Sequence, residues 1–310
     1  MNIYIAAAYS NGYLAGGADK GRYASLLPQE QACVDEIPYF LESYHYIYRQ
    51  KYVDAIRMDG RKIFLDSGAF SAWTLGTTID LPTYCDYIVK NKDIIKFDDG
   101  IMMASVLDGI GDPLKTYENQ MYMEKLGVKP LPCFHFGEDE RYLEWYVANY
   151  PYITIGGMVG KGASTLQTWL DRIWDKYLVD GSGRPKVKTH AFGITSMSIM
   201  KGYPWYSVDS STWVQMSMFG QIITEKFGVL HISDKSTARH TAGKHVSNMT
   251  PVEIATIEKM LSETCFTHER LAQSYESRGA YNMFSMQQIA KSLNESKASE
   301  HFKTHNQELF

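Results

Sequence analysis

Two segments of the chain place an aspartate at the end of an apolar run, directly before small residues. In IFLDSGAFSAW this residue is Asp66, and in PWYSVDSSTW it is Asp209. Paired carboxylates suit chemistry at an anomeric carbon, because one acid attacks or shields the cationic sugar while the other handles the proton of the leaving group. Glycosidases and base-exchange enzymes both use such a pair, and a helix cap is the alternative for Asp66. We expect Ser67 and Gly68 to offer backbone N–H groups to a ligand and Phe70 to line a pocket.

Three further segments are predicted to end strands at the same edge of the fold. VLDGIGDP ends its run with Asp108, PCFHFGED places His135 at a strand end, and YITIGG finishes with Gly156 and Gly157. A glycine pair lets a flat base approach the backbone, although it also suits a tight turn, and a structural role is the alternative for His135. His190 stands early in THAFGITS and is expected to point elsewhere.

The composition limits the class of protein. A chain of 310 residues with 45% hydrophobic content can bury one large core. The N-terminal stretch MNIYIAAAYSNGY has no basic flank and is too short for a signal peptide or membrane span, so we expect it to form a first strand. The net charge of −4 does not attract a phosphate backbone, so a nucleic-acid partner must meet a local patch. The four cysteines are far apart, which argues against a disulfide framework or zinc ribbon and fits a reducing cytoplasm.

The elements needed to position these residues follow from the alternation of short apolar runs with amphipathic segments. This pattern is typical of βα units around a parallel sheet, so we predict a single (β/α)₈ barrel domain, in which the carboxyl ends of the strands face the active site. Strands are expected at 2–8, 62–66, 101–107, 130–136, 152–156, 188–193, 205–209 and 229–232. Helices are expected at 81–95, 113–126, 138–149, 164–178 and 211–227.

The last quarter of the chain has a different character. Residues 233–249 form a polar and basic stretch without apolar periodicity, which predicts a loop. Thr250, followed by a proline and by Glu253, is typical of a helix start, so we expect a helical extension over residues 250–310. Lys235, Arg239 and Lys244 form the best local basic patch for nucleic-acid phosphates, together with His240 and His245, and a solvated loop is the alternative.

The order of the motifs resembles the tRNA-guanine transglycosylases, and more closely their DNA-modifying relatives, the DpdA-type DNA-guanine transglycosylases of phages and bacteria, over roughly residues 2–213. The resemblance implies that Asp66 in FLDSGAF is the general acid/base and that Asp209 in SVDSSTW is the nucleophile. It also implies that Asp108 hydrogen-bonds the guanine edge and that HAFGI supplies a hydrophobic lid. The complete expected set of base-binding residues is Ser67, Gly68, Phe70, Asp108, His135, Gly156, Gly157, Phe192 and Gly193.

The chain departs from the family pattern in two places. His135 stands where the tRNA enzymes have a glutamine, so the recognised base edge is open to change. Cys265 and His268 stand without the other cysteines of the family's zinc site, so we expect neither a metal nor another cofactor. Loss of that zinc site removes part of the tRNA-binding architecture and favours DNA over tRNA.

The resemblance therefore implies an enzyme that replaces guanine in DNA with a 7-deazaguanine through a covalent aspartyl intermediate. We expect it in the cytoplasm, or in the host cytoplasm if it is phage-encoded. The expected partners are DNA with a flipped-out or single-stranded guanine, and a free 7-deazaguanine base, without a membrane and with a possible second copy in a homodimer. The alternatives are a tRNA-guanine transglycosylase and a carboxylate-dependent N-glycosidase.

Overall fold

The computed structural model describes residues 1–14, 21–194, 196–241 and 245–295. The chain divides into two compact units. The first comprises Met1–Ser10 and Tyr39–Ser210 with the chain from Leu293, and the second comprises Asn11–Pro38 and Ser211–Ser292. The prediction of one domain with an extension from residue 250 is wrong in its boundaries, because the second unit starts at Ser211 and also includes Asn11–Pro38.

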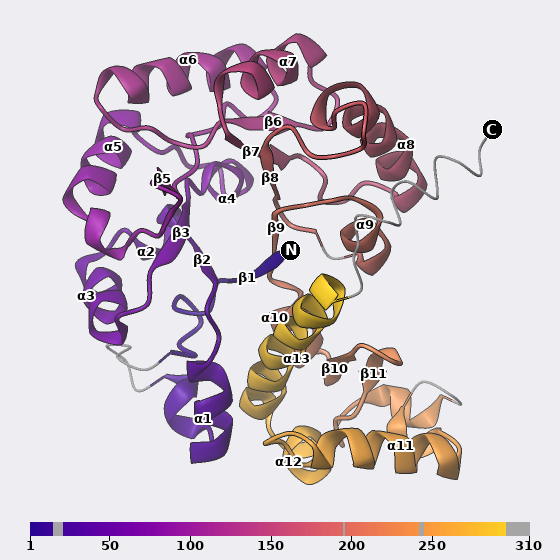
Figure 1. The fold of residues 1–310 in the computed structure, drawn as a ribbon. Helices are drawn as coiled ribbons and strands as arrows, with labels where there is room; N and C mark the ends of the chain where they lie inside the picture. The colour runs from indigo at the N-terminus through magenta and orange to yellow at the C-terminus, as the bar shows by residue number, and fades with distance from the viewer. Residues whose placement is uncertain (15–20, 195, 242–244, 296–310) are drawn as a thin grey trace. The chain divides into compact units, whose positions relative to one another are not determined.

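The first unit is built on a curled sheet of seven strands in the order β3-β2-β1-β9-β8-β7-β6 (Figure 1). Every neighbouring pair is parallel. The strands are β1 (Asn2–Ala6), β2 (Phe40–Ser43), β3 (Ile63–Asp66), β6 (Cys133–His135), β7 (Tyr152–Gly156), β8 (Lys188–Ala191) and β9 (Ser207–Ser210). Six of these strands overlap predicted ones, whereas β2 was not predicted.

The chain between the two edge strands departs from the strand predicted at 101–107. Only β5 (Ile101–Met102) is a strand there, and it pairs antiparallel with β4 (Phe97–Asp98). The residues after β5 form isolated parallel bridges, from Ala104 to Leu65 next to the end of β3 and from Ser105 to Leu131 just before β6. Backbone hydrogen bonds of 2.8–3.0 Å accompany these bridges.

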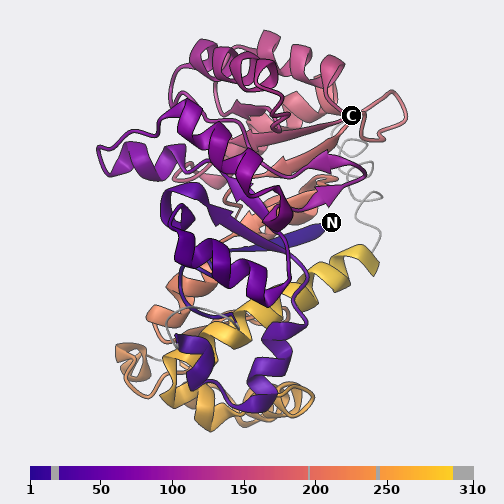
Figure 2. The same cartoon turned by 90° about the vertical axis from the view of Figure 1, so that its left-hand side faces the viewer.

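Helices flank the outer face of the curled sheet, as Figure 1 shows, and in the side view of Figure 2 those of the first half of the chain lie in front of the strands. Three of them, α5, α6 and α7, are capped by an aspartate side chain that accepts a backbone N–H bond. The helices of this unit are α2 (Tyr44–Ile47), α3 (Gln50–Asp59), α4 (Ala69–Thr74), α5 (Leu81–Lys90), α6 (Pro113–Lys125), α7 (Glu140–Asn149), α8 (Ala163–Ile173) and α9 (Met197–Gly202), with short helical turns at Lys92–Ile94 and Trp174–Leu178.

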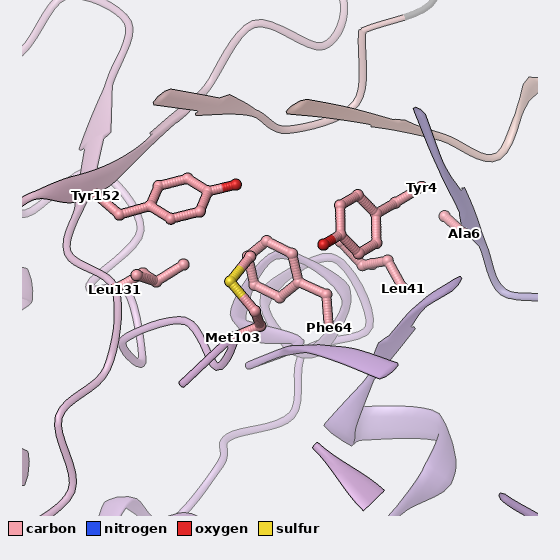
Figure 3. Packing of buried hydrophobic residues seen from close by; sticks show 7 residues of the cluster. All are labelled: Tyr4, Ala6, Leu41, Phe64, Met103, Leu131 and Tyr152. Atoms are coloured by element: carbon pink, nitrogen blue, oxygen red, sulfur yellow. The ribbon is translucent and has the colours of Figure 1, made fainter. Parts of the chain in front are cut away.

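The inner face of the sheet carries one apolar core, to which side chains from distant parts of the chain contribute (Figure 3). Phe64 of β3 belongs to this core, and its ring lies 5.6 Å from that of Tyr4 in an edge-to-face contact. The buried members of the cluster are Tyr4, Ala6, Leu41, Phe64, Met103, Leu131 and Tyr152. Because Met103 and Leu131 belong to it, the bridging segment packs inward with the regular strands.

The second unit corrects two predictions. The expected helix at 211–227 ends early, as α10 (Thr212–Met218), and is followed by β10 (Gln221–Thr224). The strand expected at 229–232 as part of the barrel is β11 (Gly228–His231), which pairs antiparallel with β10 instead. Gly220 adopts a φ of +73° between α10 and β10, and a side chain there would clash with Ser233. A glycine-dependent reversal therefore stops the helix, and the apolar periodicity did not reveal it.

Three further helices complete the second unit with α1 (Pro28–Asp35): α11 (Pro251–Ser262), α12 (His268–Gln273) and α13 (Tyr275–Glu295). Short helical turns lie at Arg22–Ser25, Thr237–His240 and Val246–Asn248. Thr250 and Glu253 form the predicted capping box of α11. Cys33 and Cys265 form a disulfide, although the wide spacing of the four cysteines had argued against a disulfide framework. None of the described helices combines the length and apolar character needed to cross a bilayer.

Gly279 lies inside α13 and packs directly against Tyr13 of the same unit. A β-carbon at this position would lie 2.1 Å from the Tyr13 hydroxyl oxygen and 2.5 Å from the adjoining ring carbon. We predict that Gly279→Ala lowers the free energy of unfolding by roughly 1–3 kcal/mol, because overpacking outweighs the gain in helix propensity. Gly202→Ala is the control, since its β-carbon would meet open space. Equal stability of the two variants in urea unfolding would show that Tyr13 moves freely and that the contact is not tight.

Candidate active site

The predicted site residues meet at the carboxyl-terminal edge of the parallel sheet. Asp66 ends β3, His135 ends β6, Gly156 ends β7, and Asp209 is the last residue but one of β9. Asp108 follows the bridging segment at the same edge. Because all strands run in one direction, residues more than a hundred positions apart share this edge. The charges of Asp108 and Asp209 both act on Asp66.

Asp66 is a half-buried acid with a raised pKa. Burial is the main cause, the charges of Asp108 and Asp209 add to it, and together they raise the pKa of Asp66 to about 7. The backbone N–H of Gly68 donates a 3.0 Å hydrogen bond to Oδ2, while the Ser105 hydroxyl lies 3.5 Å from Oδ1. At neutral pH this carboxyl group is therefore divided between its protonated and ionised forms, which is the condition for a general acid and base.

The turn after Asp66 depends on Gly68. Its φ is +78°, and a β-carbon there would come within 2.6 Å of the His45 side chain. The Ser67 N–H donates a 2.8 Å bond to the Ser105 hydroxyl oxygen and the Gly68 N–H is used by Asp66. Both amides that were expected to be open to a ligand thus have partners within the protein.

Asp209 is held in one orientation by two contacts of its Oδ1 atom. The Gly193 backbone N–H donates at 2.9 Å, and Nε2 of His190 lies 3.3 Å away. His190 is fully buried, and its Nδ1 lies 2.7 Å from the Ser207 hydroxyl. Burial lowers the pKa of His190, so the ring is a neutral partner of the carboxylate. The expectation that His190 points elsewhere is wrong: it orients Asp209.

Two aromatic residues of the predicted set lie in different surroundings. Phe192 packs against core rings, with centroid distances of 4.8 Å to His190 and 5.8 Å to Phe64. Phe70 lies on α4 with 55% of its surface exposed, beside Trp73 at 62%. The exposed pair on the helix after Asp66 is available for stacking on a flat ligand.

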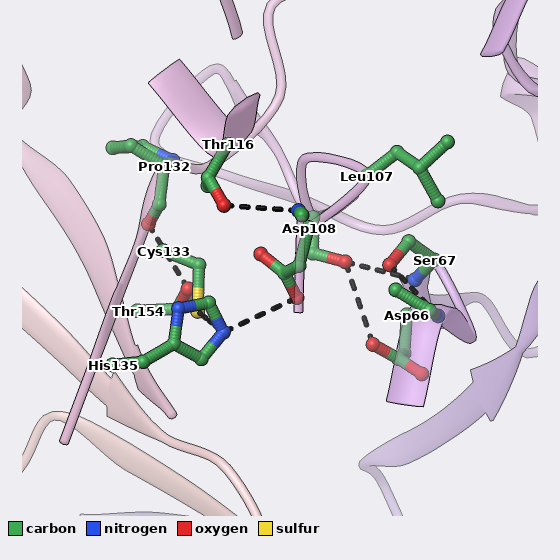
Figure 4. Close-up of polar contacts among 12 residues, drawn as sticks. Asp66, Ser67, Leu107, Asp108, Thr116, Pro132, Cys133, His135 and Thr154 are labelled. Atoms are coloured by element: carbon green, nitrogen blue, oxygen red, sulfur yellow. Dashed lines mark hydrogen bonds and ion pairs between the residues drawn. The ribbon is translucent and has the colours of Figure 1, made fainter. Parts of the chain in front are cut away.

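Asp108 and His135 lie close to Cys133, a residue that was not predicted to belong to the site. Nε2 of His135 lies 3.5 Å from Asp108 Oδ2 and 3.5 Å from Cys133 Sγ (Figure 4). The ligand atoms of these three residues all lie within 4.8 Å of one another, and they are the one such set among the described residues that could hold a metal ion. Cys133 and His135 are two positions apart on one strand, which places them on one face, so the sequence did contain a signal.

The glycine pair makes room for this group. A β-carbon on Gly156 would lie 2.9 Å from the His135 ring and 3.2 Å from Cys133 Sγ. Gly157 has a φ of +72°, and a β-carbon on it would lie 2.9 Å from the Phe136 backbone nitrogen. The pair is therefore required by close packing against β6, whatever contact it makes with a base.

The basic residues of 233–249 belong to the second unit. Lys235 is exposed, and Arg239 is exposed and pairs with Asp234 at 3.3 Å. Lys244 lies outside the described residues. His245 is buried and its Nε2 lies 3.1 Å from the Ser233 carbonyl oxygen, so it is a structural histidine and does not belong to the basic patch.

Comparison with known proteins does not assign the chain to a family, so the proposed function is based on the geometry of this sheet edge. Neither the protein-family models nor the curated proteins that were compared with the chain give a match.

Proposed function

We propose that this chain is a base-exchange enzyme that replaces guanine in a nucleic acid with a 7-deazaguanine base. The observation that supports it best is the difference between two carboxyl groups at one sheet edge. Asp66 has a pKa raised to about 7. Asp209 instead accepts a hydrogen bond from the Gly193 backbone N–H and lies 3.3 Å from Nε2 of His190. Two carboxyl groups in different environments suit division into an acid and a nucleophile.

The first half-reaction forms a covalent intermediate. Asp209 attacks C1′ of the target nucleotide as the bond from C1′ to N9 of guanine breaks, and the bonding electrons move to the departing base. Asp66 in its protonated form supplies the proton that neutralises the base. Because Gly193 binds Oδ1 of Asp209, the other oxygen is the natural nucleophile.

The second half-reaction reverses these roles. The 7-deazaguanine base enters, loses its N9 proton to the Asp66 carboxylate, and its N9 displaces Asp209 from C1′. Proton and electron pair balance over the cycle, so no nucleotide cofactor is consumed. A pKa of about 7 lets one residue perform both proton transfers near neutral pH.

Binding of a polynucleotide is supported by local features. C1′ is hidden in a duplex, so the target nucleotide must be flipped out or single-stranded. The exposed rings of Phe70 and Trp73 directly follow the Asp66 motif and can stack on bases. The missing cysteines of the family zinc site favour DNA as the polymer, with Lys235 and Arg239 as candidate phosphate contacts.

We further propose that the curled sheet, together with residues 103–106, forms a (β/α)₈-type barrel. Residues 103–106 would occupy the fourth strand position, between β3 and β6. The parallel bridges on both sides of this segment support the idea, as does the inward packing of Met103. β2, and not the predicted strand at 229–232, then completes the set of eight strand positions.

A label-exchange assay tests the proposal against its main alternatives. Incubation of guanine-containing DNA or tRNA with labelled guanine should place label in DNA. A hydrolytic N-glycosidase would release base without taking up label, because water would complete the reaction. Uptake into tRNA alone would assign the chain to tRNA-base exchange, and no release or uptake from either polymer would refute the proposed activity.

Asp209→Asn is predicted to lower exchange by roughly 10³-fold or more, because it removes the nucleophile while keeping the shape of the side chain. Denaturing mass spectrometry of wild-type protein quenched on guanine-containing DNA should show a covalent adduct that the variant lacks. Asp112→Asn, a change at the cap of α6, is the matched control and should retain activity. Near wild-type exchange by Asp209→Asn would show that another group attacks C1′.

Asp66→Asn is predicted to stabilise the fold, and more strongly as pH rises. The pKa of Asp66 is about 7 in the folded chain and near 3.8 when unfolded, so ionisation destabilises the folded state progressively between these values. The difference in unfolding free energy between variant and wild type should therefore grow from pH 4 to pH 7, by on the order of 2–4 kcal/mol, and then level off. Urea unfolding across this range measures it, with the exposed Asp86→Asn as control. A difference that stays constant with pH would contradict the raised pKa.

A further inference from the structure

Asp108, Cys133 and His135 bring three potential ligand atoms within 4.8 Å of one another, which is close enough to surround one ion. The two distances from His135 Nε2, to Asp108 Oδ2 and to Cys133 Sγ, are both 3.5 Å. A charge-assisted hydrogen bond between a histidine and a carboxylate is shorter, about 2.7–2.9 Å. Tetrahedral zinc bonds of about 2.0–2.3 Å place neighbouring ligand atoms about 3.3–3.6 Å apart. The distance from Nε2 to the Asp108 carboxylate is long for such a hydrogen bond, and both distances from Nε2 equal those between ligand atoms around a zinc ion.

The other side of the His135 ring carries the contact that metal-binding histidines usually make. Nδ1 lies 3.0 Å from Glu138 Oε1, a normal hydrogen-bond distance, and the second oxygen of Glu138 accepts the His135 backbone N–H at 2.9 Å. When the ring is neutral, a carboxylate on Nδ1 favours the tautomer in which Nε2 has a free lone pair. That lone pair is then on the side of Asp108 and Cys133.

Further observations indicate a built site. Asp108 Oδ1 is buried and has no hydrogen-bond partner among the described residues, which is unfavourable for a carboxylate oxygen unless a cation lies nearby. Gly156 leaves the space beside Cys133 and His135 that any side chain would fill. The thiol of Cys133 is buried beside these groups and is not part of a disulfide.

We propose that Asp108, Cys133 and His135 bind a divalent ion of the zinc class, with Glu138 as the residue that orients His135. Thiolate, imidazole and carboxylate together favour zinc over magnesium or calcium, which prefer oxygen ligands. Three protein ligands leave a fourth position for water or a substrate atom, as in catalytic zinc sites. This replaces the expectation of no metal, which rested on the family's C-terminal zinc motif.

Ion binding does not depend on the proposed base exchange. If exchange is confirmed, the ion deepens that proposal: it would stand where Asp108 was expected to meet the base edge, and the edge would be read through its open position. The ion's presence is decided by metal content and spectroscopy, whereas exchange is decided by label uptake. Failure of either proposal is therefore recognisable without the other.

The test begins with elemental analysis of full-length protein purified without chelator and supplied with zinc, which should give about one zinc per chain. Removal of zinc and titration with Co²⁺ should give the intense visible bands of a four-coordinate site and a thiolate-to-cobalt charge-transfer band. Cys85 is the other unpaired cysteine and supplies the matched control. Cys133→Ser should remove the charge-transfer band, and Cys85→Ser should keep it.

Two more variants separate ligation from folding. His135→Gln should reduce zinc content at least tenfold, and Glu138→Gln should keep the ion but weaken its affinity by roughly 10–100-fold, because it loosens the histidine without removing a ligand. Wild-type protein that binds no stoichiometric zinc or cobalt would overturn the proposal. So would a folded Cys133→Ser variant that retains the charge-transfer band, or loss of the band in Cys85→Ser. In that case the cluster would be a protonated His135 held between two carboxylates.

Discussion

The crowding of acidic groups at one end of a parallel sheet is the constraint on which the site depends. Asp66, Asp108 and Asp209 reach the same edge because parallel strands all end there, and their charges oppose one another in surroundings with little water. The chain relieves this in a different way for each residue. Asp66 holds a proton near neutrality, Asp209 accepts a backbone N–H bond, and Asp108 lies beside His135. The shared sheet edge thus provides a proton donor in Asp66, an oriented carboxylate in Asp209 and a candidate metal ligand in Asp108.

The rest of the first unit keeps these groups in place. The inner core packs Tyr4, Phe64 and Tyr152 together below the edge, and His190 connects that core to Asp209 through edge-to-face ring contacts and its own hydrogen bonds. Gly68 and Gly156 allow close approaches that no other residue permits. The positions of the acids are therefore fixed by packing from within the sheet, and small changes there should be felt in the chemistry.

Much of the fold followed from the sequence because strands and helices alternate with clear periodicity, and the strand-end acids followed from the same pattern. β2 was missed because its short FLES segment contains Glu42, a residue normally expected at the surface. Glu42 is fully buried here, and one of its oxygens accepts the Tyr9 backbone N–H at 2.6 Å. The roles of His190 and Glu138 were missed because their partners are set by tertiary contacts. The strand predicted at 101–107 is only partly formed, because the segment around Ala104 pairs through isolated bridges.

The proposed mechanism depends most on the raised pKa of Asp66, and carboxyl-carbon NMR measures this pKa directly. A titration of protein labelled at aspartate carboxyl carbons, assigned with Asp66→Asn, should show the Asp66 signal changing with a midpoint near pH 7. A midpoint near pH 4 would mean that Asp66 is ionised at neutral pH. It could then serve as a base but not as the acid that releases guanine, and the proposed division of roles would be contradicted.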